Sequence, residues 1–387
     1  MLFQNFQSFL KSMPVNIKDD TKCSGCTACA SICPVNAICM IPDDLGFLYP
    51  KVNYNKCINC NLCEKVCMYK KGDSQKNSPP LIVYGGRLID ESDLYKSQSG
   101  GAFWAIAQSF IKKGVIYAAG YDDEFNVLHK RATSIEACDE FRGSKYVQSD
   151  IVGIFCKIKE DLLNGTQVLF VGTGCQVDGL LNFLPSKLHE NLYTIDLICH
   201  ASPSPAIWKS YIHYLNKNKK LQAVNFRDKK FGWNSCLESF KYSHSIKHGK
   251  TFTVLWNKHL IMRSCCSNCL FTKISRKSDM TIGDYWGWEK QHNQWNDNKG
   301  VSLIIIHTEK GRRTINDSED FINLIDATND DYNQPQLQYP IEHSPHRKQF
   351  IQDFKTKGFY YIGCKYSNLG FINKIKELKR KLFKQNV

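Results

Sequence analysis

The feature that most constrains this chain is a repeat of cysteines near its amino terminus. Two runs share the spacing CxxCxxCxxxC, and they consist of Cys23, Cys26, Cys29 and Cys33 and then Cys57, Cys60, Cys63 and Cys67. A cubane cluster needs four thiolates at the corners of a tetrahedron, and three cysteines spaced by two residues can wrap one such core in a tight loop. Zinc also takes four thiolates and is the alternative, but zinc motifs usually pair two CxxC units rather than runs of three. The repeat therefore predicts two 4Fe-4S clusters.

The repeat resembles the ligand pattern of bacterial two-cluster ferredoxins over about residues 15–70. In those proteins the last cysteine of each run ligates the other cluster, and a proline then turns the chain away. The resemblance implies one cluster on Cys23, Cys26, Cys29 and Cys67, and a second cluster on Cys57, Cys60, Cys63 and Cys33. Pro34 follows the first run as the pattern requires, whereas Met68 stands at the equivalent position of the second run.

Cysteine content and charge narrow the class of protein further. The chain has 18 cysteines and its first residues do not form a signal peptide, so we expect a cytoplasmic protein whose thiols bind metal rather than form disulfides. The 51 Lys and Arg residues exceed the 37 Asp and Glu residues, which gives a net charge of +14. A net positive charge of this size is typical of proteins that bind nucleic acid. However, three 4Fe-4S clusters, each with a charge of about -2 including its four thiolates, would lower the net charge to roughly +8. We therefore expect no nucleic-acid partner. A mean hydropathy of -0.38 excludes an integral membrane protein.

A change of pattern after the second cysteine run marks a domain boundary. Residues 69–80 are polar and end in two prolines, which cannot extend a helix or a central strand. We expect an α+β ferredoxin-like two-cluster domain at residues 1–78 and a larger α/β domain at residues 79–345. Within the larger domain, apolar runs predict strands at 81–84, 115–120, 167–171, 194–199 and 301–306, and helices at 101–113 and 150–163. An alternating stretch predicts a β-hairpin with its turn at His248 and Gly249.

Residues 346–387 are expected to form a helical basic tail. The last 17 residues have their apolar side chains on one stripe of a helix: Phe371, Ile372, Ile375, Leu378, Leu382 and Phe383. The same 17 residues include six Lys or Arg and one Glu. Such a basic amphipathic helix either docks its apolar face on the domain or on a partner subunit, as in a homo-oligomer, or makes a peripheral contact with a membrane.

Four further cysteines occupy positions where metal ligands can meet. Cys175 and Cys199 follow two buried strands, and the carboxyl ends of strands in an α/β sheet form the crevice where ligands bind. Cys266 and Cys269 form a CxxC pair in the segment RSCCSNC. Together these residues predict a third four-thiolate site, with buried structural cysteines as the alternative.

Two segments are candidates for binding a phosphate or a flavin. SQSGG at residues 97–101 opens a helix, and RGSKYVQS at residues 142–149 carries Arg142 and Lys145. Backbone amides at the start of a helix favour anions, whereas an ordinary capped helix and a basic loop are the alternative. The turn at residues 172–174 does not complete GxGxxG because the next glycine is Gly179, so we expect no nicotinamide site of that type.

Five ordered segments resemble the coenzyme F420 hydrogenase/dehydrogenase beta-subunit family, whose members are iron-sulfur flavoproteins. The segments are SQSGG (97–101), RGSKYVQSD (142–150), LFVGTGCQVDGL (169–180), DLICHASPSP (196–205) and the block from RSCCSNC through SDMTIGDYWG. The resemblance implies a third cluster on Cys175, Cys199, Cys266 and Cys269. It also implies flavin neighbours at Ser99, Gly100, Gly101, Ser144, Lys145, Tyr146, Gln148 and Thr173. Gly174 and Ala201 depart from the family's usual proline and glycine, and Cys265 beside Cys266 leaves the ligand choice open.

In that family a ferredoxin domain feeds a further cluster beside FAD, and the resemblance implies a flavin-dependent iron-sulfur oxidoreductase. Clusters pass single electrons, whereas a flavin takes two and can release them as a hydride. We expect an electron-transfer protein to act at the ferredoxin domain and a small organic molecule, such as coenzyme F420, to be the substrate. A sugar-linked substrate of polysaccharide biosynthesis is one alternative, and a non-catalytic electron-relay subunit is another. His200 and Asp284 are candidate proton donors. The alternatives are that His200 is only a hydrogen-bond partner of a cluster ligand and that Asp284 is a turn residue.

Overall fold

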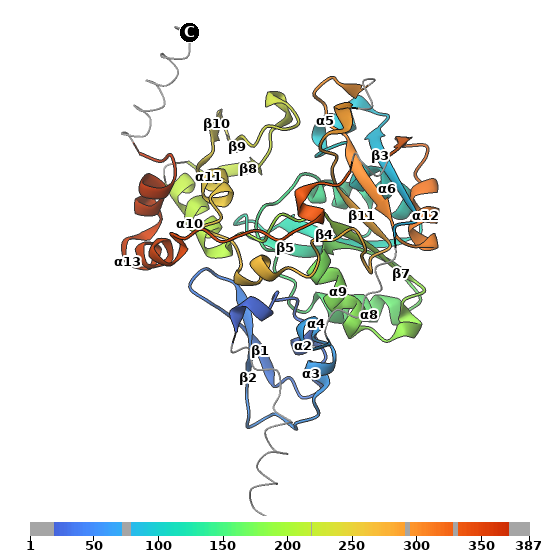
Figure 1. Cartoon of the computed structure of the whole chain (residues 1–387), viewed down its shortest axis with the longest axis horizontal. Coiled ribbons are helices and arrows are strands. Elements are labelled where there is room, and N and C mark those ends of the chain that lie inside the picture. The colour runs from blue at the N-terminus through green and yellow to red at the C-terminus, as the bar shows by residue number, and fades with distance from the viewer. Residues whose placement is uncertain (1–18, 72–78, 218, 291–294, 328–331, 371–387) are drawn as a thin grey trace, which may run out of the picture.

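The computed structural model describes residues 19–71, 79–217, 219–290, 295–327 and 332–370. Figure 1 shows the N-terminal module in blue below a body that contains a large sheet on the right and a small sheet at the upper left. The N-terminal module contains β1 (Ile38–Pro42), β2 (Leu48–Val52), α2 (Ala28–Ser31), α3 (Leu62–Lys65) and α4 (Met68–Lys71). Strands β1 and β2 pair antiparallel.

The two cysteine runs repeat in backbone conformation as well as in spacing. Gly25 and Asn59, each two residues after the first cysteine of its run, have φ of 70° and 52°. Thr27 and Asn61, two residues further on, have φ of 65° and 58° and precede helices α2 and α3. These left-handed residues turn the chain twice within each run, so that successive cysteines can face a common centre.

The large sheet is mixed, with four parallel strands at its centre. Its order is β13-β3-β12-β11-β7-β6-β4-β5. The parallel strands are β11 (Met280–Asp284), β7 (Leu192–Leu197), β6 (Gln167–Thr173) and β4 (Gly114–Tyr121). The flanking strands run antiparallel to their neighbours and are β13 (Ile322–Asp326), β3 (Ile82–Leu88), β12 (Ser302–Ile306) and β5 (Val127–Ala132).

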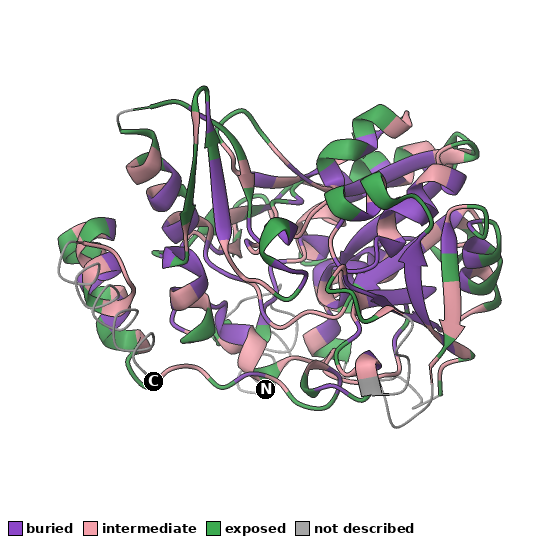
Figure 2. Ribbon diagram, turned by 90° about the horizontal axis from the view of Figure 1, so that it is seen from above, coloured by how far each residue is buried: buried purple, intermediate pink, exposed green. Residues whose placement is uncertain are grey.

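Helices cover both faces of this sheet, which explains its continuous apolar strands (Figure 2). Alternate residues of β4 and β6 point to opposite faces. Ile116 and Leu169 pack with α6 (Ala102–Phe110), α7 (Ile135–Cys138) and α12 (Glu309–Asn316). Val115 and Val168 pack with α8 (Ile154–Leu163) and α9 (Gly174–Phe183). The short helix α5 (Glu91–Lys96) follows β3.

The N-terminal module shares cores with the rest of the molecule. Ala28 and Val66 belong to the apolar cluster under α8 and α9. Leu45 and Phe47, between β1 and β2, belong to a second cluster that includes Trp208. That cluster is built by α10 (Pro205–Asn216), α11 (Thr251–Asn257), α13 (Arg347–Tyr366, with a kink at Gly358) and a three-stranded antiparallel sheet of β8 (Leu221–Asn225), β9 (Glu238–Tyr242) and β10 (Ser245–Gly249).

The structure agrees with the strands and helices expected from the apolar runs, but the hairpin turn was placed wrongly. Strands β9 and β10 turn between Tyr242 and Ser245, so His248 and Gly249 lie in a strand. The following apolar stretch is helix α11 rather than a strand, because Phe252 and Leu255 are three residues apart and both point into the core.

Two expectations about the rest of the chain stay open. The amphipathic stripe at residues 371–387 lies outside the described residues, and the domain boundaries stay predictions. In the described part of the chain no helix is both long and apolar enough to span a membrane.

Candidate metal centres and cofactor cavity

The structure brings together the first crossed set of predicted ligands. Cys23, Cys26, Cys29 and Cys67 all line one small cavity between the two cysteine runs. Burial raises the pKa of the Cys26 thiol to about 12, and the neighbouring Cys23 and Cys67 add to this effect. Burial likewise raises the pKa of Cys29, with contributions from Cys26, Cys23 and Cys67. Four mutually close thiols around a cavity match the ligand demand of a cubane cluster. We call this set the proximal set.

The second crossed set, Cys33, Cys57, Cys60 and Cys63, lies nearer the surface and is called the distal set. Cys33 and Cys63 pack around Ile38, and the Ala37 amide donates a hydrogen bond of 3.2 Å to Cys33 Sγ. Cys57 is half-buried and Cys60 is exposed. In the described part of the chain no three or more His, Cys, Asp or Glu side chains form a group that could hold a metal ion. Both sets therefore stay predictions that rest on the cysteine spacing and on the neighbourhood of the side chains.

Three members of the predicted third set, Cys175, Cys199 and Cys269, are electrostatic neighbours at the carboxyl ends of β6 and β7. Burial and then the charges of Cys175 and Cys269 raise the pKa of Cys199 well above its usual range. Burial and then Cys265 raise the pKa of Cys175 to about 12. Backbone amides donate to two of the sulfurs, from Ser202 to Cys266 at 3.3 Å and from Phe271 to Cys269 at 3.4 Å.

The structure favours Cys265 as an alternative to Cys266 for the fourth ligand of the third set. Cys265 is 5% exposed, and its charge acts on Cys175, Cys269 and Cys23. Cys266 instead packs with an apolar group that includes Met262. The CxxC spacing favours Cys266, whereas this neighbourhood favours Cys265.

The proximal and third sets meet across helix α9. Cys175 lies at the start of this helix, and Gly179 follows one turn later. A Cβ built on Gly179 would lie 2.7 Å from Cys26 Cβ and 2.8 Å from Cys26 Sγ. Only glycine allows this approach, because any side chain would have to displace the cysteine loop. The charge of Cys175 also raises the pKa of Cys26, so the two thiols are electrostatic neighbours.

A cavity of about 270 Å³ opens beside the third set, at the carboxyl ends of the central strands. Its lining includes the predicted cofactor residues Ser99, Gly101, Ser144, Lys145, Tyr146, Gln148 and Thr173, together with Cys199, His200 and Asp284. Gly100 is not part of the lining. Its amide donates to Ser302 Oγ at 2.9 Å, and a Cβ there would lie 2.0 Å from the carbonyl oxygen of Gly86. Gly100 therefore lets the turn pack closely on β3.

The cavity wall carries buried nitrogen atoms without a hydrogen-bond partner among the described residues. These atoms are Gln98 Nε2, Trp104 Nε1, Arg142 Nε, Arg227 Nε and Trp256 Nε1. Buried polar groups in folded proteins are nearly always hydrogen-bonded, so such a group of donors indicates a ligand rich in acceptors. The phosphates and ring carbonyls of a flavin dinucleotide meet that requirement.

A buried ion pair forms the wall at Asp284. Arg227 is 4% exposed and donates to Asp284 Oδ2 at 2.6 Å and to the Tyr146 hydroxyl at 3.2 Å. Ser99 Oγ donates to the other carboxylate oxygen. Asp284 is thus an acceptor that holds the SQSGG turn. Sequence reasoning missed Arg227, because no local motif marks it and only the fold brings it to Asp284.

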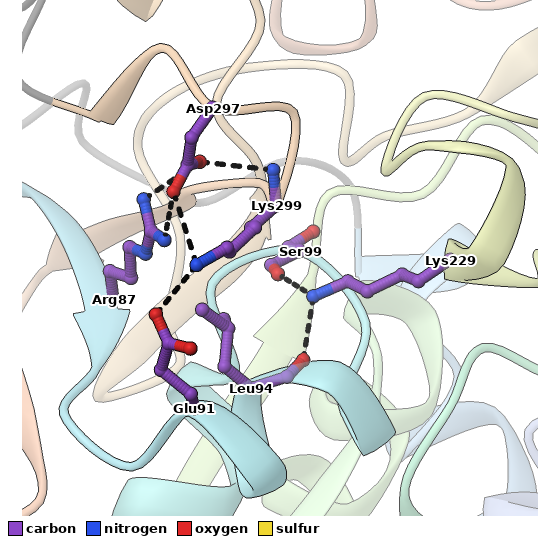
Figure 3. Close-up of polar contacts among 7 residues, drawn as sticks. All are labelled: Arg87, Glu91, Leu94, Ser99, Lys229, Asp297 and Lys299. Carbon is purple, nitrogen blue, oxygen red and sulfur yellow. Dashed lines mark hydrogen bonds and ion pairs between the residues drawn. The ribbon is translucent and has the colours of Figure 1, made fainter.

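Lys229 secures the same turn from the other side (Figure 3). Its Nζ donates to the carbonyl oxygens of Leu94 at 2.8 Å and Ser99 at 2.6 Å. Ser99 has a φ of 49°, a left-handed conformation that a non-glycine residue adopts at a cost, so the turn depends on these bonds. Burial lowers the pKa of Lys229 to about 7. On the outer side of the turn, Arg87 pairs with Asp297, and Lys299 pairs with Glu91 and Asp297.

His200 lies between two cavities. It lines the cofactor cavity and also a second cavity of about 520 Å³ that includes His259 and Gln336. The Nε2 atoms of His200 and His259 are 2.8 Å apart, and Gln336 Nε2 is 3.2 Å from His200 Nδ1. Burial and the neighbouring His259 lower the pKa of His200 to about 4. No sequence signal marked His259, which is distant from His200 along the chain.

Comparisons with known proteins match two parts of the chain. Residues 165–329 match the family model for the carboxyl-terminal region of the coenzyme F420 hydrogenase/dehydrogenase beta subunit, and residues 22–71 match the model for a 4Fe-4S dicluster domain. A chain in a xenon-derivatized structure of the F420-reducing [NiFe] hydrogenase complex from Methanosarcina barkeri is 16% identical. The match covers 79% of this chain and 94% of that chain, with a TM-score of 0.44. A likeness at this level assigns no residue role. No curated protein matches the chain significantly.

Proposed function

Because the chain belongs to the coenzyme F420 hydrogenase/dehydrogenase beta-subunit family and carries a 4Fe-4S dicluster domain, we propose that it is a flavin-dependent iron-sulfur oxidoreductase. It would connect a partner protein to an organic substrate through two ferredoxin clusters, a third cluster and FAD. The observation that carries this proposal is the cavity with unpartnered donors beside Cys199. When bound there, FAD would supply the exchange between single electrons and hydride.

Residues of the cavity would hold and orient the flavin. Lys145 supplies positive charge to the wall, whereas the charge of Arg142 is paired with Asp93 and Asp139; the unpartnered nitrogens would supply hydrogen bonds. Asp284, held by Arg227, keeps the SQSGG turn in its left-handed conformation. His200 lies between this cavity and the second cavity, and we assign it the exchange of a proton at Nδ1 or Nε2.

The route for electrons follows the packing of the N-terminal module on the body. The proximal set lies against α9, whose first turn carries Cys175, so the proximal and third clusters would be neighbours. The distal set lies nearer the surface. Ile58 and Tyr54 are 60% and 53% exposed beside the exposed Cys60, and exposed lysines lie nearby at Lys51 and Lys56. This apolar surface with positive charge fits an acidic electron-transfer protein.

For the substrate we propose only a chemical class, a small organic molecule that accepts or donates a hydride. Coenzyme F420 is the substrate that the family suggests, and a sugar-linked molecule is the second candidate. A relay subunit without chemistry of its own would need no flavin, whereas hydride transfer requires one.

The proposed function is tested by releasing the cofactor. Protein purified without oxygen should release FAD when it is denatured with acid, at about one equivalent per chain, because the cavity donors have no other partner. The measurement is chromatography of the supernatant with an FAD standard. Protein with full iron content that releases no flavin and does not bind added FAD would contradict the enzyme proposal and favour the relay.

The charge of Lys145 predicts how FAD binding depends on pH. Burial lowers the pKa of Lys145 to about 7, so its ammonium group is largely charged below pH 7 and largely neutral above it. The phosphates of FAD are anionic, so the charged form should bind more tightly and affinity should fall as pH rises. If only the charged form binds, the affinity for FAD falls by at most about tenfold for each pH unit above 7. Titration of apoprotein with FAD from pH 6 to 9 measures this slope.

The matched controls are Lys145→Met, which should bind weakly with a flat profile, and Lys145→Arg, which should bind tightly with a flat profile. A slope that survives in both variants would show that another group is responsible.

A further inference from the structure

Arg263 is a buried cation at the junction between the cysteine repeat and the larger domain. It directly precedes the segment of Cys265 and Cys266, and only 1% of its surface is exposed. Burial of a guanidinium group is costly unless its hydrogen bonds and its charge are compensated. Its contacts therefore show what this part of the fold is built to hold.

Two nitrogens of the guanidinium group donate to the N-terminal module, and the third donates to a side chain of the larger domain that itself binds the module. Nε donates to the carbonyl oxygen of Cys23 at 2.8 Å, and Nη2 donates to the carbonyl oxygen of Leu48 at 2.8 Å. Nη1 donates to Gln148 Oε1 at 2.9 Å, and Gln148 Nε2 donates to the carbonyl oxygen of Ser24 at 2.8 Å. Arg263 and Gln148 together clamp the start of the first cysteine run.

Two features show how closely the loop fits this cation. The guanidinium carbon lies 4.3 Å from the centre of the Tyr49 ring. Gly25 has a φ of 70°, and a Cβ there would lie 2.9 Å from Arg263 Nη1. A side chain at position 25 would therefore displace the guanidinium group as well as strain the backbone.

The hydrogen bonds of Arg263 are satisfied, but its charge is not. Its carbonyl and amide acceptors are neutral, and among the described residues no carboxylate pairs with it; Asp43 interacts only at longer range. The remaining contact is with Cys23 Sγ, 3.7 Å from Nη2. Cys23 is a member of the proximal set, so a cluster on that set would place negative charge beside this cation.

We propose that Arg263 is a positioning residue that holds the Cys23 loop on the larger domain and raises the reduction potential of the proximal cluster. This inference rests on the clusters of the proposed function. Reduction adds a negative charge to a cluster, and a nearby desolvated cation favours the reduced form. Net charge and hydrogen bonds to sulfur are the main protein controls of such potentials. No arginine among the described residues donates to a sulfur of the distal set, so we expect no effect on the distal cluster. The charge of Arg263 also acts on Cys175 and Cys265, so we expect a smaller effect of the same sign on the third cluster.

The test is a redox titration of anaerobically purified, full-length protein, followed by EPR spectroscopy. Arg263→Gln removes the charge and keeps a hydrogen-bonding side chain. We expect the ratio of reduced to oxidised proximal cluster at a fixed potential to fall at least tenfold, which is about 59 mV for one electron. The midpoint of the distal cluster should stay in place, and that of the third cluster should fall by less than that of the proximal cluster. Arg131→Gln is the matched control, because Arg131 is surface-exposed and pairs with Asp161 away from the cysteines.

A second variant keeps the test decisive if Arg263→Gln fails to load a cluster. The variant is Gln148→Glu with Gln148→Leu as its control, because both lose the bond from Nε2 to the Ser24 carbonyl oxygen and only Gln148→Glu adds a carboxylate that neutralises Arg263. Gln148→Glu should lower the same midpoint. If the midpoints are unchanged in a variant that carries its full iron, the proposed role of Arg263 is wrong, but the proposed function of the protein is not affected. Wild-type protein without iron-sulfur signals would overturn the proposed function as well.

Discussion

Replacing Cys175 with serine is expected to remove about a third of the iron, from about 12 to about 8 atoms per chain at four irons per cubane. Cys175 lies at the start of α9 with Thr173 Oγ1 3.2 Å from its sulfur, and the charges of Cys265 and Cys269 act on it. Loss of one thiolate would open the third cluster to oxidation, while the proximal and distal sets keep their ligands. Iron analysis and EPR spectroscopy measure this change.

The same variant should lose the reduction of flavin by electrons supplied through the N-terminal module. Direct chemical reduction of the flavin should persist, because the cavity donors are untouched. Cys156→Ser is the control, since Cys156 is exposed and belongs to no predicted set. Full iron content in Cys175→Ser would return this cysteine to a structural role.

The iron assay also decides between two neighbouring cysteines. Cys265→Ser and Cys266→Ser are predicted to differ, because only one of the two side chains can complete the third set. The variant that loses about a third of the iron identifies the ligand. If neither variant loses iron, neither Cys265 nor Cys266 is the fourth ligand of the third set.

Replacing Gly179 with leucine is expected to uncouple the N-terminal module from the third site. Even a Cβ at this position would lie 2.7 Å from Cys26 Cβ, so the leucine has to push the cysteine loop away from α9. Overpacking of this kind costs about 1–3 kcal/mol, and the larger effect is on the distance between the proximal and third clusters. We expect at least a tenfold slower reduction of flavin through the module, measured by stopped-flow absorbance, and a lower unfolding temperature.

Asn182→Ala on the same helix is the matched control for Gly179→Leu. Asn182 Oδ1 accepts a hydrogen bond of 3.0 Å from Lys71, so the alanine removes a contact across the same interface without adding bulk. It should change the rate of flavin reduction little. An unchanged rate in Gly179→Leu, with full iron content, would show that the electrons take another route.

The hydrophobic pattern determined most of the secondary structure, and glycines marked several element ends. Strands such as β6 and β12 are buried on both faces and therefore read as continuous apolar runs. Helix α6 begins directly after Gly101, which has a φ of 83°. The hairpin was misplaced because β10 is largely exposed and has no clear alternation, so its turn carries no signal.

By itself, the sequence determined the chemistry of the cysteine repeat, since ligands two and three residues apart meet through local backbone geometry alone. The left-handed residues Thr27 and Asn61 recur at equivalent positions for this reason. Only the tertiary structure brought Arg227 to Asp284, His259 to His200 and Arg263 to Cys23, because the order and direction of strands decide which distant segments become neighbours. Buried charges such as Arg263 are decided at that level, since desolvation depends on everything that packs around the group rather than on its neighbours in the chain.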